Sequence, residues 1–87
     1  MKLTITVSSL PEARARMNKQ MLSETTSLIS EGYRYDSTAN LLGGVVIHRF
    51  KHKRNGNRMS IAVGTNYVQI TKNQKTLKRY EYKMHQL

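Results

Sequence analysis

The sequence contains no cysteine and no tryptophan, and it has only one proline, one phenylalanine and five acidic residues. The missing cysteine excludes a disulfide framework, a thiolate metal site and a thiol nucleophile. No apolar run approaches the roughly 18 residues that a membrane span requires, and the N-terminal apolar run is too short for a signal peptide. We therefore expect a cytoplasmic protein that has no membrane partner.

The scarcity of acidic residues leaves the chain strongly basic. Fifteen Lys and Arg against five Asp and Glu give a net charge of +10 over 87 residues. Such a charge favours nucleic acid or an acidic protein surface as partner, although in a small protein it can also serve solubility alone. The length fits a single small basic domain, residues 1–87, close to the lower limit for folding without disulfides or metals.

The first third of the chain predicts a strand followed by a long helix. Apolar and polar residues alternate from Lys2 to Val7, as in a strand with one buried face. Ser9 and Glu12 have the spacing of a capping box, and Gly32 is a typical residue to follow a helix end. The helix is therefore expected from about residue 10 to 31, with an apolar stripe made of Ala13, Met17, Met21, Leu28 and Ile29.

The remainder predicts an antiparallel β-meander, which gives an α+β fold with the N-terminal helix packed on the sheet. Residues 32–36 have the pattern of a short strand, residues 37–40 that of a loop, and residues 45–71 that of three strands joined by tight turns. The leading strand is expected to add to an edge. An exposed edge at Leu3–Val7 or Val68–Ile70 would invite pairing between two copies into a homodimer. Residues 75–87 fit either a helix or a strand, and the helical spacing covers more of them.

The most informative segment is VVIHRFKHKRNGNRMSIAV, residues 45–63, which predicts a β-hairpin. Asn55-Gly56 is a strong signal for a two-residue type I′ turn. Because side chains alternate with period two, the hairpin places most of its cations on one face and its apolar residues on the other. The cross-strand pairs expected from this turn are Lys53 with Arg58, Lys51 with Ser60 and Arg49 with Ala62.

The hairpin cations are the candidate binding residues for nucleic acid or an acidic partner. Each can neutralise a phosphate, which would make binding strongly dependent on salt. Tyr80 and Tyr82 near the C-terminus are flanked by further cations. Their rings could stack on nucleic-acid bases, or they are half-buried core residues. The full set of candidate binding residues is Arg49, Lys51, Lys53, Arg54, Arg58, Lys78 and Arg79.

No pattern in the chain predicts a cofactor, a metal site or a confident catalytic residue. The acidic residues are scattered, which argues against a two-metal nuclease site. His48 and His52 share one face of the expected strand, but no third ligand lies nearby in the sequence. The two histidines fit structural roles, while His48 is also the candidate base for cleavage of RNA if the protein is a nuclease.

Residues 48–58, HRFKHKRNGNR, resemble the basic hairpin of HicA-type mRNA interferase toxins. The segment Glu31 to Tyr33 is similar to the end of their helix, and Thr76 to Lys78 is similar to the start of their final helix. This resemblance covers about residues 28–80 and implies a fold like that of the double-stranded RNA-binding domain, α-β-β-β-α. Ile47 stands where the resemblance would place the catalytic histidine, and the leading strand has no counterpart in those toxins.

Three functions follow as hypotheses from the sequence. The first is a small nucleic-acid-binding protein with little sequence specificity, with RNA slightly favoured over DNA. The second is a phage-type inhibitor or interaction protein that docks its basic face on an acidic surface or nucleic-acid channel of a host complex. The third is a HicA-like, metal-independent endoribonuclease.

Overall fold

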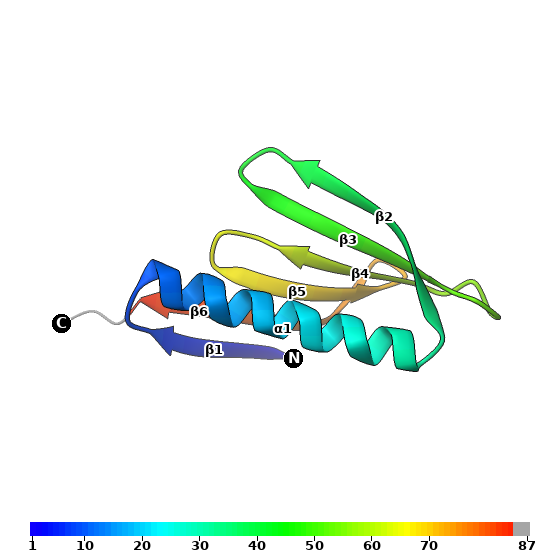
Figure 1. Ribbon diagram of the computed structural model, residues 1–87, viewed down its shortest axis with the longest axis horizontal. Coiled ribbons are helices and arrows are strands. Elements are labelled where there is room, and N and C mark those ends of the chain that lie inside the picture. Colours follow the sequence, from blue (N-terminus) through cyan, green and yellow to red (C-terminus); the bar gives the residue numbers. More distant parts are fainter. Residues whose placement is uncertain (85–87) are drawn as a thin grey trace.

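The computed structural model describes residues 1–84, which form one helix packed on a six-stranded sheet (Figure 1). The predicted α+β fold, with a leading strand and one long N-terminal helix, is confirmed. Residues 85–87, which the expected C-terminal element included, lie outside the described residues. The elements in chain order are β1 (Lys2–Val7), α1 (Leu10–Ser30), β2 (Tyr33–Leu41), β3 (Val45–His52), β4 (Arg58–Val63), β5 (Tyr67–Lys72) and β6 (Lys75–Met84).

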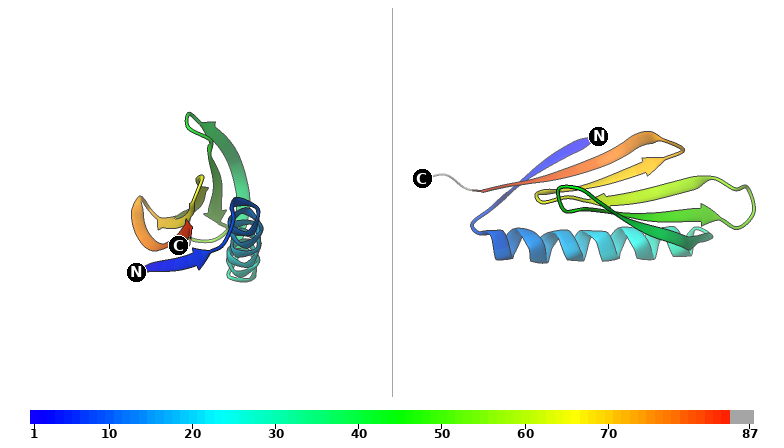
Figure 2. Two further views of the ribbon diagram at one scale, coloured as in Figure 1. Left: turned by 90° about the vertical axis from the view of Figure 1, so that its left-hand side faces the viewer. Right: turned by 90° about the horizontal axis from the view of Figure 1, so that it is seen from above.

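The sheet has the strand order β1-β6-β5-β4-β3-β2. Strands β2 to β6 are antiparallel neighbours in chain order. The predicted three-stranded meander, β3 to β5, is therefore extended by β2, which was expected as a short strand, and by β6. Strand β1 adds at the edge, as expected, and pairs in parallel with β6. Because α1 connects the two edge strands, it crosses one face of the sheet and leaves the other face uncovered (Figure 2).

Helix α1 begins and ends close to the predicted positions. The Ser9 hydroxyl accepts a hydrogen bond from the Glu12 amide at 3.2 Å. The Glu12 carboxylate accepts hydrogen bonds from the amide and the hydroxyl of Ser8 at 2.6 and 2.7 Å. In a capping box it would accept from the amide of the cap residue, Ser9. At the other end Gly32 has a φ of 99°, and an added Cβ would lie 2.9 Å from Nε2 of His52. Glycine therefore meets both a conformational and a steric requirement at this helix end.

The core lies between α1 and the covered face of the sheet. Ala13, Met17 and Leu28 are buried on the helix, as the apolar stripe predicts, and Met21 packs against them. Ile29 was included in the predicted stripe but is 57% exposed, because it is turned by about 100° from Leu28 around the helix. The sheet contributes the alternating residues of its central strands, with Phe50, Met59, Ile61, Val68, Ile70 and Tyr82 buried.

The C-terminal segment is a strand, so the helix that its spacing favoured does not form in residues 75–84. The HicA resemblance implies a final helix that starts near Thr76, but the structure has strand β6 at this position. Asn73 and Gln74 both have positive φ, 47° and 71°, and they join Lys72 to Lys75 in a two-residue turn. This geometry is that of a type I′ turn, and it directs residues 75–84 back along β5.

Two further expectations are corrected by the sheet. Residues 37–40, predicted as a loop, belong to β2, whose register with β3 shifts between Tyr35 and Ser37. The bulge at this shift accommodates turn-forming residues within a strand. The expected edge at Val68–Ile70 is wrong, because β5 lies between β4 and β6; the edges are β1 and β2.

Within residues 1–84, α1 is the element long enough to be considered as a bilayer span, and it lacks the apolar content that crossing would require.

The bonds from Ser8 predict a pH-dependent contribution of Glu12 to stability. They hold the pKa of Glu12 below its ordinary value, with the backbone amide as the largest cause and the Ser8 hydroxyl next. Ionised Glu12 therefore stabilises the fold above its unfolded-state pKa, and this contribution is lost as the pH falls through the folded-state pKa. We expect Glu12→Gln to lower the melting temperature at pH 7 and to have no effect at a pH where wild-type Glu12 is protonated.

Thermal unfolding followed by circular dichroism across this pH range would measure the effect. Glu31→Gln is the matched control, because Glu31 lies at the C-terminal end of α1, where a negative charge opposes the helix dipole. This control should leave stability unchanged or raise it slightly at pH 7. A pH-independent loss in Glu12→Gln would contradict the assigned role of the ionised carboxylate.

Candidate polyanion-binding face

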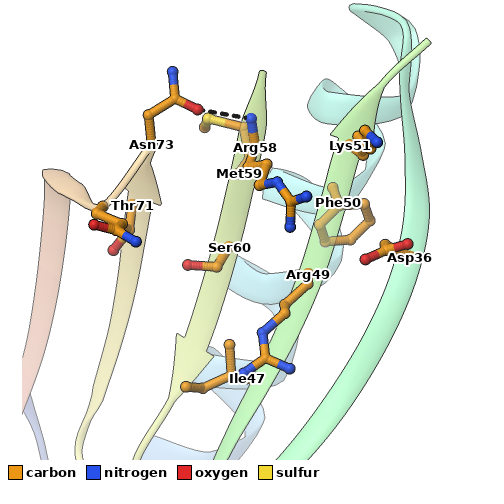
Figure 3. A pocket seen from close by; sticks show the side chains of 11 residues that line it. Asp36, Ile47, Arg49, Phe50, Lys51, Arg58, Met59, Ser60, Thr71 and Asn73 are labelled. Atoms are coloured by element: carbon orange, nitrogen blue, oxygen red, sulfur yellow. Dashed lines mark hydrogen bonds between the residues drawn. The ribbon is translucent and has the colours of Figure 1, made fainter. Parts of the chain in front are cut away.

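The uncovered face of the sheet carries the hairpin cations. In β3 the side chains of Arg49 and Lys51 point away from α1, and in β4 those of Arg58 and Ser60 do the same (Figure 3). The predicted segregation of cations and core residues onto opposite faces is therefore confirmed for the two strands. The predicted register is wrong by two residues, because Lys51 pairs with Arg58 and Arg49 pairs with Ser60.

The register differs because Asn55 and Gly56 do not form a two-residue turn. Gly56 has a φ of 72°, but Asn55 does not have a positive φ, so the type I′ geometry is absent there. A longer loop, residues 53–57, joins β3 to β4. The backbone amide of His52 donates to the Asn57 carbonyl at 2.8 Å, and the Asn55 side chain accepts from the Asn57 amide at 2.9 Å. These bonds close a longer loop in place of the expected turn.

The sheet adds Arg34 to the cations that the sequence pattern predicts on this face. Arg34 of β2 pairs with Lys51, which pairs on its other side with Arg58. The three cations therefore form a row across β2, β3 and β4, all of them exposed. The alternation of Arg34 with Tyr33 and Tyr35 in the sequence indicates that Arg34 lies on the opposite side of the strand from the two tyrosines. Only the strand order places it beside Lys51. We define the cationic face as this row together with Arg49 and the loop residues Lys53 and Arg54.

No acidic side chain within residues 1–84 lies within ion-pair distance, 4.0 Å, of any cation in the cationic face. Like charges directly opposite each other destabilise a pair of strands. The row Arg34–Lys51–Arg58 contains two such pairs. The cationic face thus has a repulsive arrangement that an anionic ligand would relieve.

A shallow hollow of about 450 Å³ lies beside the row (Figure 3). Arg49, Lys51 and Arg58 line it, together with the hydroxyl-bearing residues Ser60 and Thr71. Asp36 contributes one carboxylate to its rim, from the bulged part of β2. The hollow combines several cations with neutral hydrogen-bonding groups, which suits a ligand that carries phosphates and hydroxyls.

On the other half of the uncovered face, Arg79 and Lys2 share the Glu81 carboxylate. Arg79 donates to Glu81 at 2.7 Å and to Gln69 at 2.6 Å, and its guanidinium carbon lies 4.1 Å from the centre of the Tyr67 ring. Lys2 reaches the same Glu81 carboxylate at 3.2 Å. The hydrogen bonds from Arg79 and then from Lys2 lower the pKa of Glu81, so this carboxylate remains ionised and forms an ion pair with each of the two cations. Arg79 thus shares the uncovered face with Arg49 but is already paired.

Lys78 lies on the covered face, away from the other candidate binding residues. Its ammonium lies 3.5 Å from the Glu24 carboxylate of α1. The same carboxylate accepts from Gln20 at 3.0 Å and from the Tyr80 hydroxyl at 3.3 Å. Burial, and then the proximity of Glu24, raises the pKa of Tyr80 above its ordinary value. Lys78 and Tyr80 therefore connect β6 to the helix, and Tyr82 beside them is buried in the core.

The two candidate histidines lie on the covered side of β3, as the alternation predicts, and each has a hydrogen-bond partner. Nδ1 of His48 lies 3.2 Å from the Thr38 hydroxyl. His48 is therefore on the opposite side of the sheet from Arg49 and Lys51, whereas Ile47 lines the hollow. Across residues 1–84, no three His, Asp or Glu side chains gather closely enough to hold a metal ion.

His52 fixes the loop that carries Lys53 and Arg54. Its Nε2 lies 3.0 Å from the Glu31 carbonyl, and its Nδ1 accepts from the amides of Arg54 at 3.1 Å and Asn55 at 3.4 Å. The tautomer with its proton on Nε2 satisfies all three bonds. One imidazole therefore joins the end of α1 to the loop, and its ring makes a T-shaped contact with the ring of Tyr33.

We expect His52→Phe to loosen the loop, because phenylalanine retains the ring but makes none of these three bonds. The free energy of unfolding should fall by about 1–2 kcal/mol, the scale of hydrogen bonds lost at a partly buried site. Hydrogen exchange of the Arg54 and Asn55 amides should become faster. Chemical denaturation and exchange measured by NMR would test both expectations.

The control is His48→Phe, the same change on the same face of the same strand. His48 has one side-chain partner, so the loss of stability should be smaller and exchange in the loop should not change. Equal losses in the two variants, with unaltered loop exchange, would contradict the role assigned to His52.

Comparisons with known protein families, curated proteins and solved structures found no significant match to this chain. The charge pattern and the geometry of the uncovered face are therefore the basis on which a function can be assigned.

Proposed function

We propose that the protein binds nucleic acid through the cationic face, mainly by contacts to phosphates and with little sequence specificity. The observation that carries this proposal is the unpaired row Arg34–Lys51–Arg58, in which like charges lie directly opposite each other across three strands. A phosphate backbone would neutralise several of these cations at once and release its own counterions. The hydroxyl groups of Ser60 and Thr71 beside the row would add contacts to the sugar–phosphate backbone.

Some of the remaining strand cations have partners within the fold, whereas Lys72, Lys75 and Lys83 have no ion-pair partner within residues 1–84. Arg79 and Lys2 share one carboxylate, and Lys78 contacts the helix, so these cations have partners within the fold. The cations of β2, β3, β4 and their loop have none within residues 1–84. RNA remains slightly favoured over DNA because hydroxyl groups line the hollow, where they can reach the 2′-hydroxyl. RNA cleavage by His48 has less support, because His48 lies on the other side of the sheet.

The first test removes three cations of the face together. The variant Arg49→Ala, Lys51→Ala, Arg58→Ala should bind RNA and DNA more weakly than the wild type. The plot of log K against log salt should become shallower, with the magnitude of its negative slope reduced by up to about three units, one for each lost phosphate contact. Fluorescence anisotropy with labelled oligonucleotides at several salt concentrations would measure both quantities, and circular dichroism would verify the fold.

The matched control removes three exposed charges from α1, with Arg14→Ala, Arg16→Ala and Lys19→Ala. Both variants have the same net charge, so a difference between them reports the location of the charges. The control should retain a nearly wild-type salt slope. Equal slopes in the two variants would remove the assignment of the site, and absence of binding by the wild type to any nucleic acid would overturn the proposal in favour of an acidic protein partner.

A charge reversal in the row should change stability and binding in opposite directions. Arg58→Glu places a carboxylate directly opposite Lys51 and replaces a repulsive pair with an attractive one. The free energy of unfolding should rise by roughly 0.2–1 kcal/mol, the range for cross-strand pairs. Affinity for nucleic acid should fall by more than in Arg58→Ala. Urea denaturation and anisotropy would test the pair of expectations, and increased affinity in Arg58→Glu would contradict the proposed site.

A further inference from the structure

Within residues 1–84, the uncovered face presents no free aromatic ring to a base. Tyr67 is the aromatic residue of the described strands on this face, and the guanidinium of Arg79 covers its ring. Tyr33, Phe50 and Tyr82 are buried in the core. Proteins that bind single strands depend on aromatic stacking, at about 1–3 kcal/mol per base. The cationic face lacks this source of affinity and can offer a ligand only charge and hydrogen bonds.

The cations are spread in two directions and do not follow a single line. Arg34, Lys51 and Arg58 extend across three strands, which are spaced about 4.8 Å apart in a sheet. Arg49 and Lys51 lie two residues apart along β3, and Lys53 continues in the same direction into the loop. Figure 1 shows this loop projecting past the end of α1. An array of this shape can contact two phosphate backbones, whereas a single strand offers one.

The backbone that carries part of the array is fixed by hydrogen bonds. His52 fixes the amides of Arg54 and Asn55, and the Asn73 side chain accepts from the Arg58 amide at 2.9 Å. A preorganised backbone favours a ligand that is itself stiff, because the conformational freedom lost on binding is then mainly that of the Lys and Arg side chains. A duplex has a persistence length of about 50 nm, whereas a single strand would be ordered on this face without stacking to offset the entropy lost.

We infer that the ligand of the cationic face is a double-stranded nucleic acid held by its phosphates. This inference rests on the proposed function. The cation row contacts the sugar–phosphate backbone, and the projecting loop with Lys53 and Arg54 reaches the adjacent groove or the second backbone.

Anisotropy with one oligonucleotide sequence, free and annealed to its complement, tests the inference in RNA and in DNA over a range of salt concentrations. With about six phosphate contacts, the salt slopes for a duplex and a single strand differ by about one unit. If the two forms bind equally at about 1 M salt, this difference makes duplex binding about tenfold tighter near 0.1 M salt. Equal or tighter binding of the single strand would overturn the inference while leaving the proposed function intact. Binding of neither form would overturn the proposed function itself.

Tyr35→Ala provides a second, independent readout. Tyr35 is 57% exposed at the β2 edge, on the side of the sheet that bears α1, and packs edge-on against Phe50. It is next to Arg34, so a single strand bound at the row could turn toward it and stack a base. The affinity of the folded variant for the duplex should stay within about twofold of the wild-type affinity. A tenfold or greater loss of this affinity would indicate that a base stacks on Tyr35, which requires an unpaired base and would contradict binding of an intact duplex.

Discussion

The burial of one face of the sheet beneath a single helix is the constraint on which the rest of the structure depends. A chain of this length provides one helix within the described residues, and that helix can cover only one side of six strands. Apolar side chains therefore concentrate on that side, where Ile61, Val68 and Ile70 are almost completely inaccessible to solvent. The alternation of strand residues then assigns the intervening positions to the uncovered face, and the cations of β3 and β4 occupy those positions.

The uncovered face is not uniform in its electrostatics. Near β1 and β6, a single carboxylate, Glu81, serves two cations, and Arg79 also packs over Tyr67. Near β2, β3 and β4, cations oppose cations with no such compensation within residues 1–84. A protein that needed charge only for solubility would gain stability by alternating the signs across neighbouring strands. The row across these three strands retains a destabilising arrangement, and that is the physical reason for the proposal that it binds an anionic ligand.

Local signals predicted the elements well where a single interaction decides them. Ser9 and Gly32 delimit α1 through a side-chain cap and a positive φ, and both requirements are local. The turn between β3 and β4 was predicted poorly, because the bonds of His52 to the loop and to Glu31 outweigh the preference of Asn55-Gly56 for a two-residue turn. At Asn73 and Gln74 the sequence did not predict a two-residue turn, but the structure has a type I′ turn there. This turn directs residues 75–84 into a strand, although their spacing favoured a helix.

The sequence by itself determined which side of each strand its residues occupy, because a shift of two residues in register preserves the faces. It therefore determined that Arg49, Lys51 and Arg58 share a surface opposite the core. Only the tertiary structure decided which cations are neighbours and which are free. Arg34 joins the row because β2 lies beside β3, Lys78 leaves it because its side of β6 meets α1, and Arg79 is neutralised because β6 brings Glu81 and β5 brings Gln69 within reach. These outcomes depend on strand order and on contacts between residues far apart in the chain, which no local pattern encodes.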